Sequence, residues 1–173
     1  WKKTADVVLS NGDRIRDFMK SSGMTGDNKS VIILTGAGTS EFTGNAVSWY
    51  LRKALKREVL SIPTTHLVTH LPSMLIEGHN NVLVSIARSG NSPESLAVYR
   101  MAKQCFPGIR QIVITCNRSG ALAETATKDM DTLIILLPEE TNDKSLAMTS
   151  SFSSMALTAL GLGLIGNPDE LKA

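Results

Sequence analysis

Residues 82–105, which read VLVSIARSGNSPESLAVYRMAKQC, decide the fold of this chain. A short apolar run with a β-branched core begins at Val82, and such a run predicts a buried strand. Further along, Ser92 is a natural N-cap and Pro93 suits the first position of a helix. We therefore expect a helix from Pro93 to Cys105, joined to the strand by a short polar loop.

The same alternation of strand and helix runs through the rest of the chain. Similar apolar runs begin at Val31, Val59, Ile112 and Leu133. Segments of helical period are Thr4–Ser21, Glu41–Leu55, His66–Leu75, Ala121–Thr127 and Thr149–Leu164. Apolar strands that alternate with helices are typical of a parallel sheet covered on both faces. We predict one α/β/α sandwich with a five-stranded parallel sheet. If the strand order is 2-1-3-4-5, ligands bind between the loops that follow the first and third strands.

Composition excludes several classes of protein. The chain of 173 residues has a formal net charge of +2 and no basic run, so a nucleic-acid partner is not expected. Its apolar runs are too short to cross a membrane, and its first residues do not lead into a signal peptide. No metal-binding spacing links Cys105 and Cys116, which predicts free thiols in a reducing cytoplasm. No cofactor or metal is expected.

The two ends of the sequence suggest how the chain is organised. It opens within a predicted helix and closes on Gly166-Asn167-Pro168, and Asn-Pro after a helix end is a natural break. We expect a leading helix in residues 1–22, the main domain in 23–166, and in 167–173 the start of a linker to a second domain.

The loop after the first strand reads TGAGTSE over residues 35–41. Its two glycines permit a tight turn, and its hydroxyls sit where a helix begins, which favours an anion. A nucleotide is a weak alternative, because Glu41 replaces the third glycine of the dinucleotide motif and the lysine of a P-loop is missing. A plain turn with Ser40 as the helix cap explains these residues equally well.

The loop after the third strand holds Arg88, Ser89, Asn91 and Ser92. One side-chain acceptor is sufficient to cap a helix, so this density of donors favours phosphate binding over a solvated cap. A third polar cluster surrounds the start of the last helix, at Thr149, Ser150, Ser151, Ser153 and Ser154. Hydroxyls disfavour a helix but suit a polyhydroxylated ligand. The alternative is that one of them caps the helix and the others face water.

Taken together, TGAGTS (35–40), ARSGNSPES (87–95) and AMTSSFSSM (147–155) resemble the sugar isomerase (SIS) family. The likeness covers nearly the whole chain, and ARSGNS is its most specific part. It is greatest to the branch of tagatose-6-phosphate ketose/aldose isomerases and galactosamine-6-phosphate deaminase/isomerases. The resemblance implies a flavodoxin-like sandwich that commonly occurs in tandem pairs. It also implies a phosphorylated sugar or amino sugar as the ligand.

The resemblance assigns positions in three segments to ligand binding. The positions are Gly38, Thr39 and Ser40 in the first loop, Arg88, Ser89, Asn91 and Ser92 in the second, and Thr149 and Ser150 at the last helix. Ser89 and Ser92 fall on the phosphate-binding positions, and Ser40 falls on a sugar contact. The related isomerase half of glucosamine-6-phosphate synthase has Gln and Glu where this chain has Arg88 and Asn91.

Moving a carbonyl from C1 to C2 requires a base for the carbon-bound proton and a donor that polarises the carbonyl. The resemblance implies that the base is a glutamate of a second SIS half. Within this chain the weak candidates are Glu41, Glu140 and His70. Glu41 suits a helix-dipole role, Glu140 a solvated loop and His70 a helix surface. His66 and His70 have the spacing of a metal pair, but no third ligand is evident.

We therefore predict the phosphosugar-binding half of an isomerase or deaminase that works through an enediol or enolamine. The alternative is a sugar-phosphate sensor in a transcriptional regulator, but the leading helix carries no basic recognition element. We also expect a homo-oligomer, because SIS halves usually complete their site across an interface. The apolar last helix, with Met148, Phe152, Met155, Leu157 and Leu160, and the leading helix are the expected contact surfaces.

Overall fold

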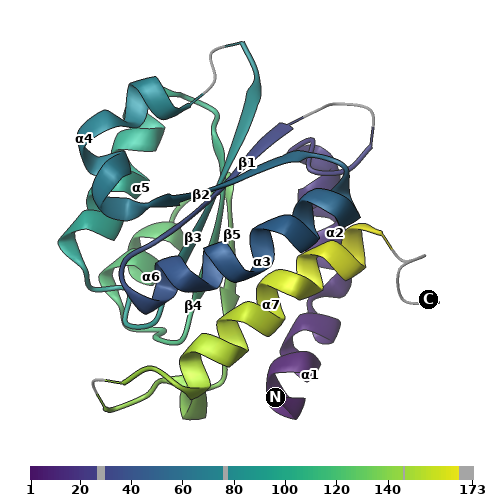
Figure 1. The fold of residues 1–173 in the computed structure, drawn as a ribbon, viewed down its shortest axis with the longest axis vertical. Helices are drawn as coiled ribbons and strands as arrows, with labels where there is room; N and C mark the ends of the chain where they lie inside the picture. The colour runs from purple at the N-terminus through teal and green to yellow at the C-terminus, as the bar shows by residue number, and fades with distance from the viewer. Residues whose placement is uncertain (27–29, 76–77, 146, 168–173) are drawn as a thin grey trace.

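The protein is described by a computed structural model that covers residues 1–26, 30–75, 78–145 and 147–167. One parallel sheet of five strands, in the order β2-β1-β3-β4-β5, forms its centre (Figure 1). The strands are β1 (Ser30–Gly36), β2 (Glu58–Pro63), β3 (Asn80–Ala87), β4 (Arg110–Thr115) and β5 (Thr132–Leu136). The fold class and strand order predicted from the sequence are confirmed. Residues 168–173, where most of the expected linker falls, lie outside the described residues.

Helices cover both faces of this sheet (Figure 1). One face carries α1 (Lys2–Ser10), α2 (Gly12–Ser21), α3 (Thr39–Leu55) and α7 (Ser150–Gly166). The other carries α4 (Thr64–Met74), α5 (Pro93–Cys105) and α6 (Ala121–Ala126). A short 3-10 helix, η1 (Glu139–Thr141), follows β5. None of the described helices is both long and apolar enough to span a membrane.

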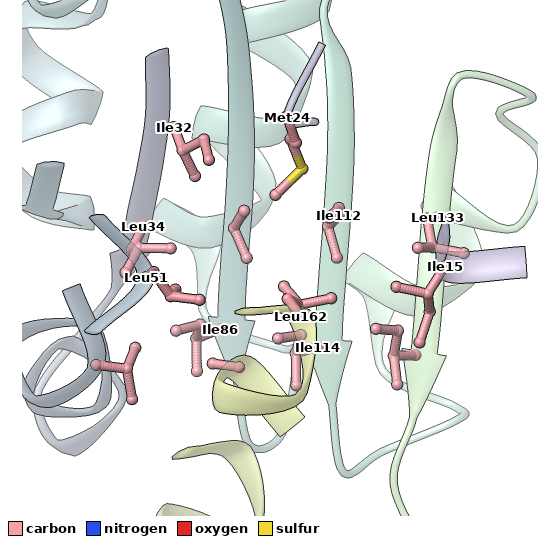
Figure 2. Packing of buried hydrophobic residues seen from close by; sticks show 14 of the residues in the cluster. Ile15, Met24, Ile32, Leu34, Leu51, Ile86, Ile112, Ile114, Leu133 and Leu162 are labelled. Atoms are coloured by element: carbon pink, nitrogen blue, oxygen red, sulfur yellow. The ribbon is translucent and has the colours of Figure 1, made fainter. Parts of the chain in front are cut away.

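Alternate residues of each strand supply the two halves of the core. Ile32 and Leu34 of β1 face the layer of α3 and α7, where they join Leu51 and Leu162 (Figure 2). Ile33, between them, faces α4 and α5. Burying one such side chain stabilises the fold by about 1.5–3 kcal/mol. The continuous apolar runs of the sequence thus give strands that are buried on both sides.

The leading segment is two helices rather than the single one predicted. Asn11 separates α1 from α2 with φ −97° and ψ 7°, and its side chain donates to the carbonyl of Val7 at 2.8 Å. Asparagine competes for backbone hydrogen bonds and glycine weakens a helix, so Asn11-Gly12 ends α1. The predicted apolar face is nevertheless right, since Ile15 and Met19 are fully buried.

Helix α5, which begins at the polar loop after β3, is fixed to the sheet by a buried phenol. Tyr99 Oη donates to Asp129 Oδ2 at 2.6 Å and lies 2.8 Å from Thr132 Oγ1. Burial raises the pKa of Tyr99, and the bond to Asp129 raises it further, so the phenol remains a donor. Lys103, one turn later, pairs with Asp129 at 3.0 Å.

Candidate functional site

The predicted ligand loops lie side by side at the carboxyl end of the sheet. Strands β1 and β3 are neighbours, with Thr35 opposite Ser85, and β2 lies on the other side of β1, so the winding reverses here. A hollow of about 150 Å³ lies at this point. Its lining includes Ala37 and Ser40 from the first loop, Arg88, Ser89, Gly90 and Ser92 from the second, and Met148.

The loop after β3 is held from behind by the segment between β4 and α6. The carbonyl of Arg88 accepts from Thr115 Oγ1 at 3.3 Å, that of Ser89 from Asn117 Nδ2 at 2.9 Å, and that of Gly90 from the Leu122 N–H at 2.9 Å. Each peptide unit is planar and trans, so the N–H groups of the following residues point the other way. An anion on the other side of the loop would therefore meet N–H groups rather than these three carbonyl oxygens.

The two serines of this loop have different bonding. Ser92 caps α5 as predicted, because its Oγ accepts the Ser95 N–H at 3.1 Å. The Ser92 hydroxyl also donates to Ser95 Oγ at 2.8 Å, so its proton is already in use. Ser89 Oγ accepts the Asn91 N–H at 3.3 Å, and no residue that the structure describes accepts its own proton. Ser89 is thus the better placed of the two to donate to an anion.

Arg88 and Asn91 connect the loop to other parts of the chain. Asn91 Oδ1 accepts the Ala121 N–H at 3.0 Å, where α6 begins, and the amide nitrogen of Asn91 is the group that could donate to an anion. Arg88 Nη1 donates to the carbonyl of Ser145 at 2.9 Å, in the segment before α7. A guanidinium has further N–H groups, so Arg88 keeps donors for a phosphate.

The first loop requires glycine at its tightest point. A Cβ on Gly36 would lie 2.6 Å from the carbonyl carbon of Ser40 and 2.8 Å from the Glu41 nitrogen. Gly38 adopts φ +57° and is the N-cap of α3, without any side-chain capping bond. The reading of Ser40 as the helix cap is therefore wrong. Ser40 is buried in the first turn of α3 and lines the hollow. Thr39, the residue before it, is half-buried.

The start of α7 is capped by Asp143, which the sequence analysis did not single out. Its carboxylate accepts the N–H groups of Thr149 at 2.9 Å, Ser150 at 3.3 Å and Ser151 at 2.9 Å. It also accepts the hydroxyls of Thr149 and Ser151. These bonds, first of all those from Ser151, hold the pKa of Asp143 well below its usual range. Thr149 and Ser150 are the predicted ligand residues at this helix. The hydroxyl of Thr149 donates to Asp143, whereas the hydroxyl of Ser150 bonds to none of the described residues.

None of the three candidate bases lines the hollow. Glu41 lies in the first turn of α3, as expected of a dipole partner. Glu140 pairs with Lys3 of α1, and that bond lowers the pKa of its exposed carboxyl. His70 is exposed at a kink in α4, with φ −136°, and its Nδ1 lies 2.6 Å from Thr69 Oγ1. Within the described part of the chain, no three His, Cys, Asp or Glu side chains are placed to hold a metal ion.

Two larger hollows lie away from the predicted residues. One, of about 710 Å³, lies between α1 and the segments after β4 and β5, and its charged residues have both signs. The other, of about 580 Å³, lies at the amino ends of β3 and β4. We place the candidate site at the smaller hollow, because it alone of these three lies where the winding of the sheet reverses and is lined by the donor-rich loops. At about 150 Å³ it is smaller than a typical ligand pocket, which measures about 300–1,000 Å³.

Comparisons with known proteins agree on one family. The family model of the SIS domain matches residues 27–162 of the sequence. D-galactosamine-6-phosphate deaminase AgaS of Escherichia coli O157:H7 is 41% identical over 131 residues, which are 76% of this chain and 34% of that protein. The protein of the same name from Shewanella sp. (strain ANA-3) is 41% identical over 133 residues, 75% of this chain and 34% of that protein.

A solved structure of a similar protein also matches this chain over nearly its whole length. The crystal structure of tagatose-6-phosphate ketose/aldose isomerase from Escherichia coli has a TM-score of 0.86 and 33% identity to this chain. It covers 97% of this chain, which in turn covers 44% of that protein. The chain therefore spans less than half the length of each of these relatives.

Proposed function

Because this chain belongs to the SIS domain family, we propose that it is the phosphosugar-binding part of an aldose–ketose isomerase or deaminase. Its substrate would be a hexose phosphate or amino-hexose phosphate of the tagatose-6-phosphate or galactosamine-6-phosphate type. One observation carries this proposal: Arg88, Ser89 and Ser92 line the hollow, while the carbonyls of Arg88, Ser89 and Gly90 are bonded to the segment behind the loop. The names of the relatives support the substrate class.

In this proposal the phosphate sits against the loop after β3, and the carbon chain extends past Ser40 and the start of α7. A base removes the proton from C2 of the aldose and returns it to C1, while the C1 oxygen gains a proton and the C2 hydroxyl loses one. The carbonyl thereby moves from C1 to C2 through an enediol. For an amino sugar the enolamine becomes an imine, and its hydrolysis releases ammonia. The candidate bases Glu41, Glu140 and His70 all lie outside the hollow, so we propose that a second SIS domain supplies the base.

The relatives also bear on the alternative function and on the compartment. Both curated relatives are named as enzymes, which favours an enzyme over a sensor module of a transcriptional regulator. Cys105 and Cys116 are unpaired, and burial raises the pKa of the Cys116 thiol, so it stays neutral. Free thiols suit a reducing compartment, and we place the protein in the cytoplasm as part of this proposal.

We expect the isolated chain to bind a sugar phosphate weakly and to leave it unconverted, since its hollow is small and none of its three candidate bases lines it. The test is to incubate the chain with tagatose-6-phosphate or galactosamine-6-phosphate and to follow the sugar product and free ammonia. Turnover clearly above background would show that the base lies within this chain. Glu41, Glu140 and His70 would then be the first residues to substitute.

We propose that a second SIS domain packs on α3 rather than on α7. Met155 of α7 is fully buried in this domain's own core, and Leu160 packs against that core. Helix α3 instead exposes Phe42 and Trp49, at 59% and 76% of their surfaces. They are seven positions apart, or about two turns, so they share one face. Because α3 starts at the first ligand loop, a partner on this face would border the hollow.

We expect the chain to form a dimer at micromolar concentration, with Trp49 in the contact. Sedimentation velocity should show that Trp49→Glu shifts the protein to monomer, because a buried charge without a partner is costly. Met130→Glu is the matched control, since Met130 is 98% exposed but lies next to β5. A wild-type chain that sediments as a monomer would contradict this arrangement.

A further inference from the structure

The segment between β5 and α7 is tied to the rest of the site at two points. Arg88, in the loop after β3, donates to the carbonyl of Ser145 at 2.9 Å. Two residues before Ser145, the carboxylate of Asp143 holds the first turn of α7. Met148 follows shortly after and lines the hollow together with Ala37 and Ser40. The position of this wall of the hollow therefore depends on the two ties.

Asp143 has no capacity left for a ligand. Its two oxygens accept five hydrogen bonds, from three backbone N–H groups and two hydroxyls. A carboxylate offers about four lone-pair sites, so these bonds fill it. The carboxylate also occupies the place at the start of α7 that an external anion would prefer. This arrangement makes Asp143 a structural anchor and disqualifies it as a base.

We propose that Asp143 is a positioning residue that sets the sugar end of the site. By anchoring the first turn of α7, it fixes the position of Met148, which lines the same hollow as Ser40 and directly precedes that turn. At the phosphate end, the carbonyls of Arg88, Ser89 and Gly90 are held by Thr115, Asn117 and α6, and among the described residues Asp143 bonds none of these. This inference rests on the proposed function and adds that Ser89 and the wall at Met148 are held by different bonds, with the bond from Arg88 to the carbonyl of Ser145 as a link between the two.

The separation predicts a selective defect. Asp143→Asn keeps the size of the side chain but removes its charge and replaces one acceptor by a donor, so several bonds to α7 are lost. We expect affinity for galactosamine-6-phosphate to fall about tenfold, while affinity for inorganic phosphate stays within about twofold. Ser89→Ala should lower the affinity for both ligands. A residue that merely supports the fold would not discriminate between the two ligands.

The experiment is an NMR titration of the chain with inorganic phosphate and, separately, with galactosamine-6-phosphate. Glu139→Gln is the matched control, because it changes an exposed carboxylate of the same segment and should bind both ligands as the wild type does. Should Asp143→Asn fail to fold, Ser151→Ala removes one hydroxyl donor to Asp143, at 2.7 Å, and should cause a smaller loss, of about threefold, for the sugar phosphate alone.

The inference would be overturned if a folded Asp143→Asn or Ser151→Ala chain lost affinity for both ligands equally. It would also be overturned if that chain kept its affinity for both. Failure of the proposed function looks different. In that case the wild type itself would bind neither inorganic phosphate nor galactosamine-6-phosphate, and the inference would fall with it.

Discussion

Gly120→Ala is expected to abolish measurable binding of a hexose phosphate, although Gly120 does not line the hollow. A Cβ at this position would lie 2.3 Å from the carbonyl oxygen of Ser89, which is backbone and cannot rotate away. It would also lie 3.3 Å from Asn117 Nδ2, the group that donates to that carbonyl. The loop that carries Ser89 must therefore shift, or the segment behind it must separate from it.

The cost of this substitution is purely steric. Gly120 has φ −71° and ψ 141°, a conformation that alanine adopts readily. Overpacking of this kind costs about 1–3 kcal/mol or more, depending on how far the backbone can move. Thermal unfolding measures that cost, and titration with a sugar phosphate measures the effect on the site.

Gly12→Ala is the matched control for Gly120→Ala. No heavy atom outside Gly12, its two chain neighbours and the adjoining backbone of its own helix lies within 4 Å of the Cβ that it would add, and Gly12 begins α2, outside the ligand loops. It should bind as the wild type does. Normal affinity in the folded Gly120→Ala chain would mean that the geometry of the Ser89 loop is irrelevant to binding.

Ser89→Ala is expected to reduce the affinity for a sugar phosphate by about one to two decades. A hydroxyl that donates to a phosphate dianion forms a charge-assisted bond, which contributes about 1.5–3 kcal/mol. The proton of Ser89 can take this role, since Ser89 Oγ accepts within the loop and donates to none of the described residues. Ser92→Ala is a poorer test, because it also removes the cap of α5, worth about 1 kcal/mol.

The measurement compares the wild type with Ser89→Ala at constant ionic strength. Both proteins are titrated with a sugar phosphate and with the same sugar without its phosphate. Their affinities should differ for the sugar phosphate and agree for the unphosphorylated sugar. Ser119→Ala, an exposed serine of the neighbouring segment, serves as the control. If the mutant binds the sugar phosphate as tightly as the wild type does, Ser89 does not contact the phosphate.

Local features of the sequence were sufficient to predict much of this molecule. The β-branched apolar runs predicted all five strands. A strand that is buried on both faces is apolar throughout, so its own residues are sufficient to identify it. The Ser92-Pro93 pair predicted the start of α5 for a similar reason, since the cap bonds to a residue only three positions away. The parallel sheet then brought the first and second polar loops together at one edge.

Other features depend on contacts between remote segments and could not be predicted. The role of Gly120 arises from a close approach to Ser89, and that of Asn91 from a bond to the start of α6. Asp143 precedes α7 by several residues, so it does not match the usual pattern of an N-cap. The apolar last helix suggested an interface, but its residues are largely used in packing against α1, α2 and α3.

The central claim is that a sugar phosphate is held by the loop after β3. It is tested most directly by a crystal structure of this chain with galactosamine-6-phosphate, in which the phosphorus atom is located. We predict that the phosphate oxygens lie within hydrogen-bond distance of Ser89 Oγ and of the N–H groups of Ser89 and Gly90. Phosphate density in the larger hollow beside Arg118, with the Ser89 loop empty, would contradict the account.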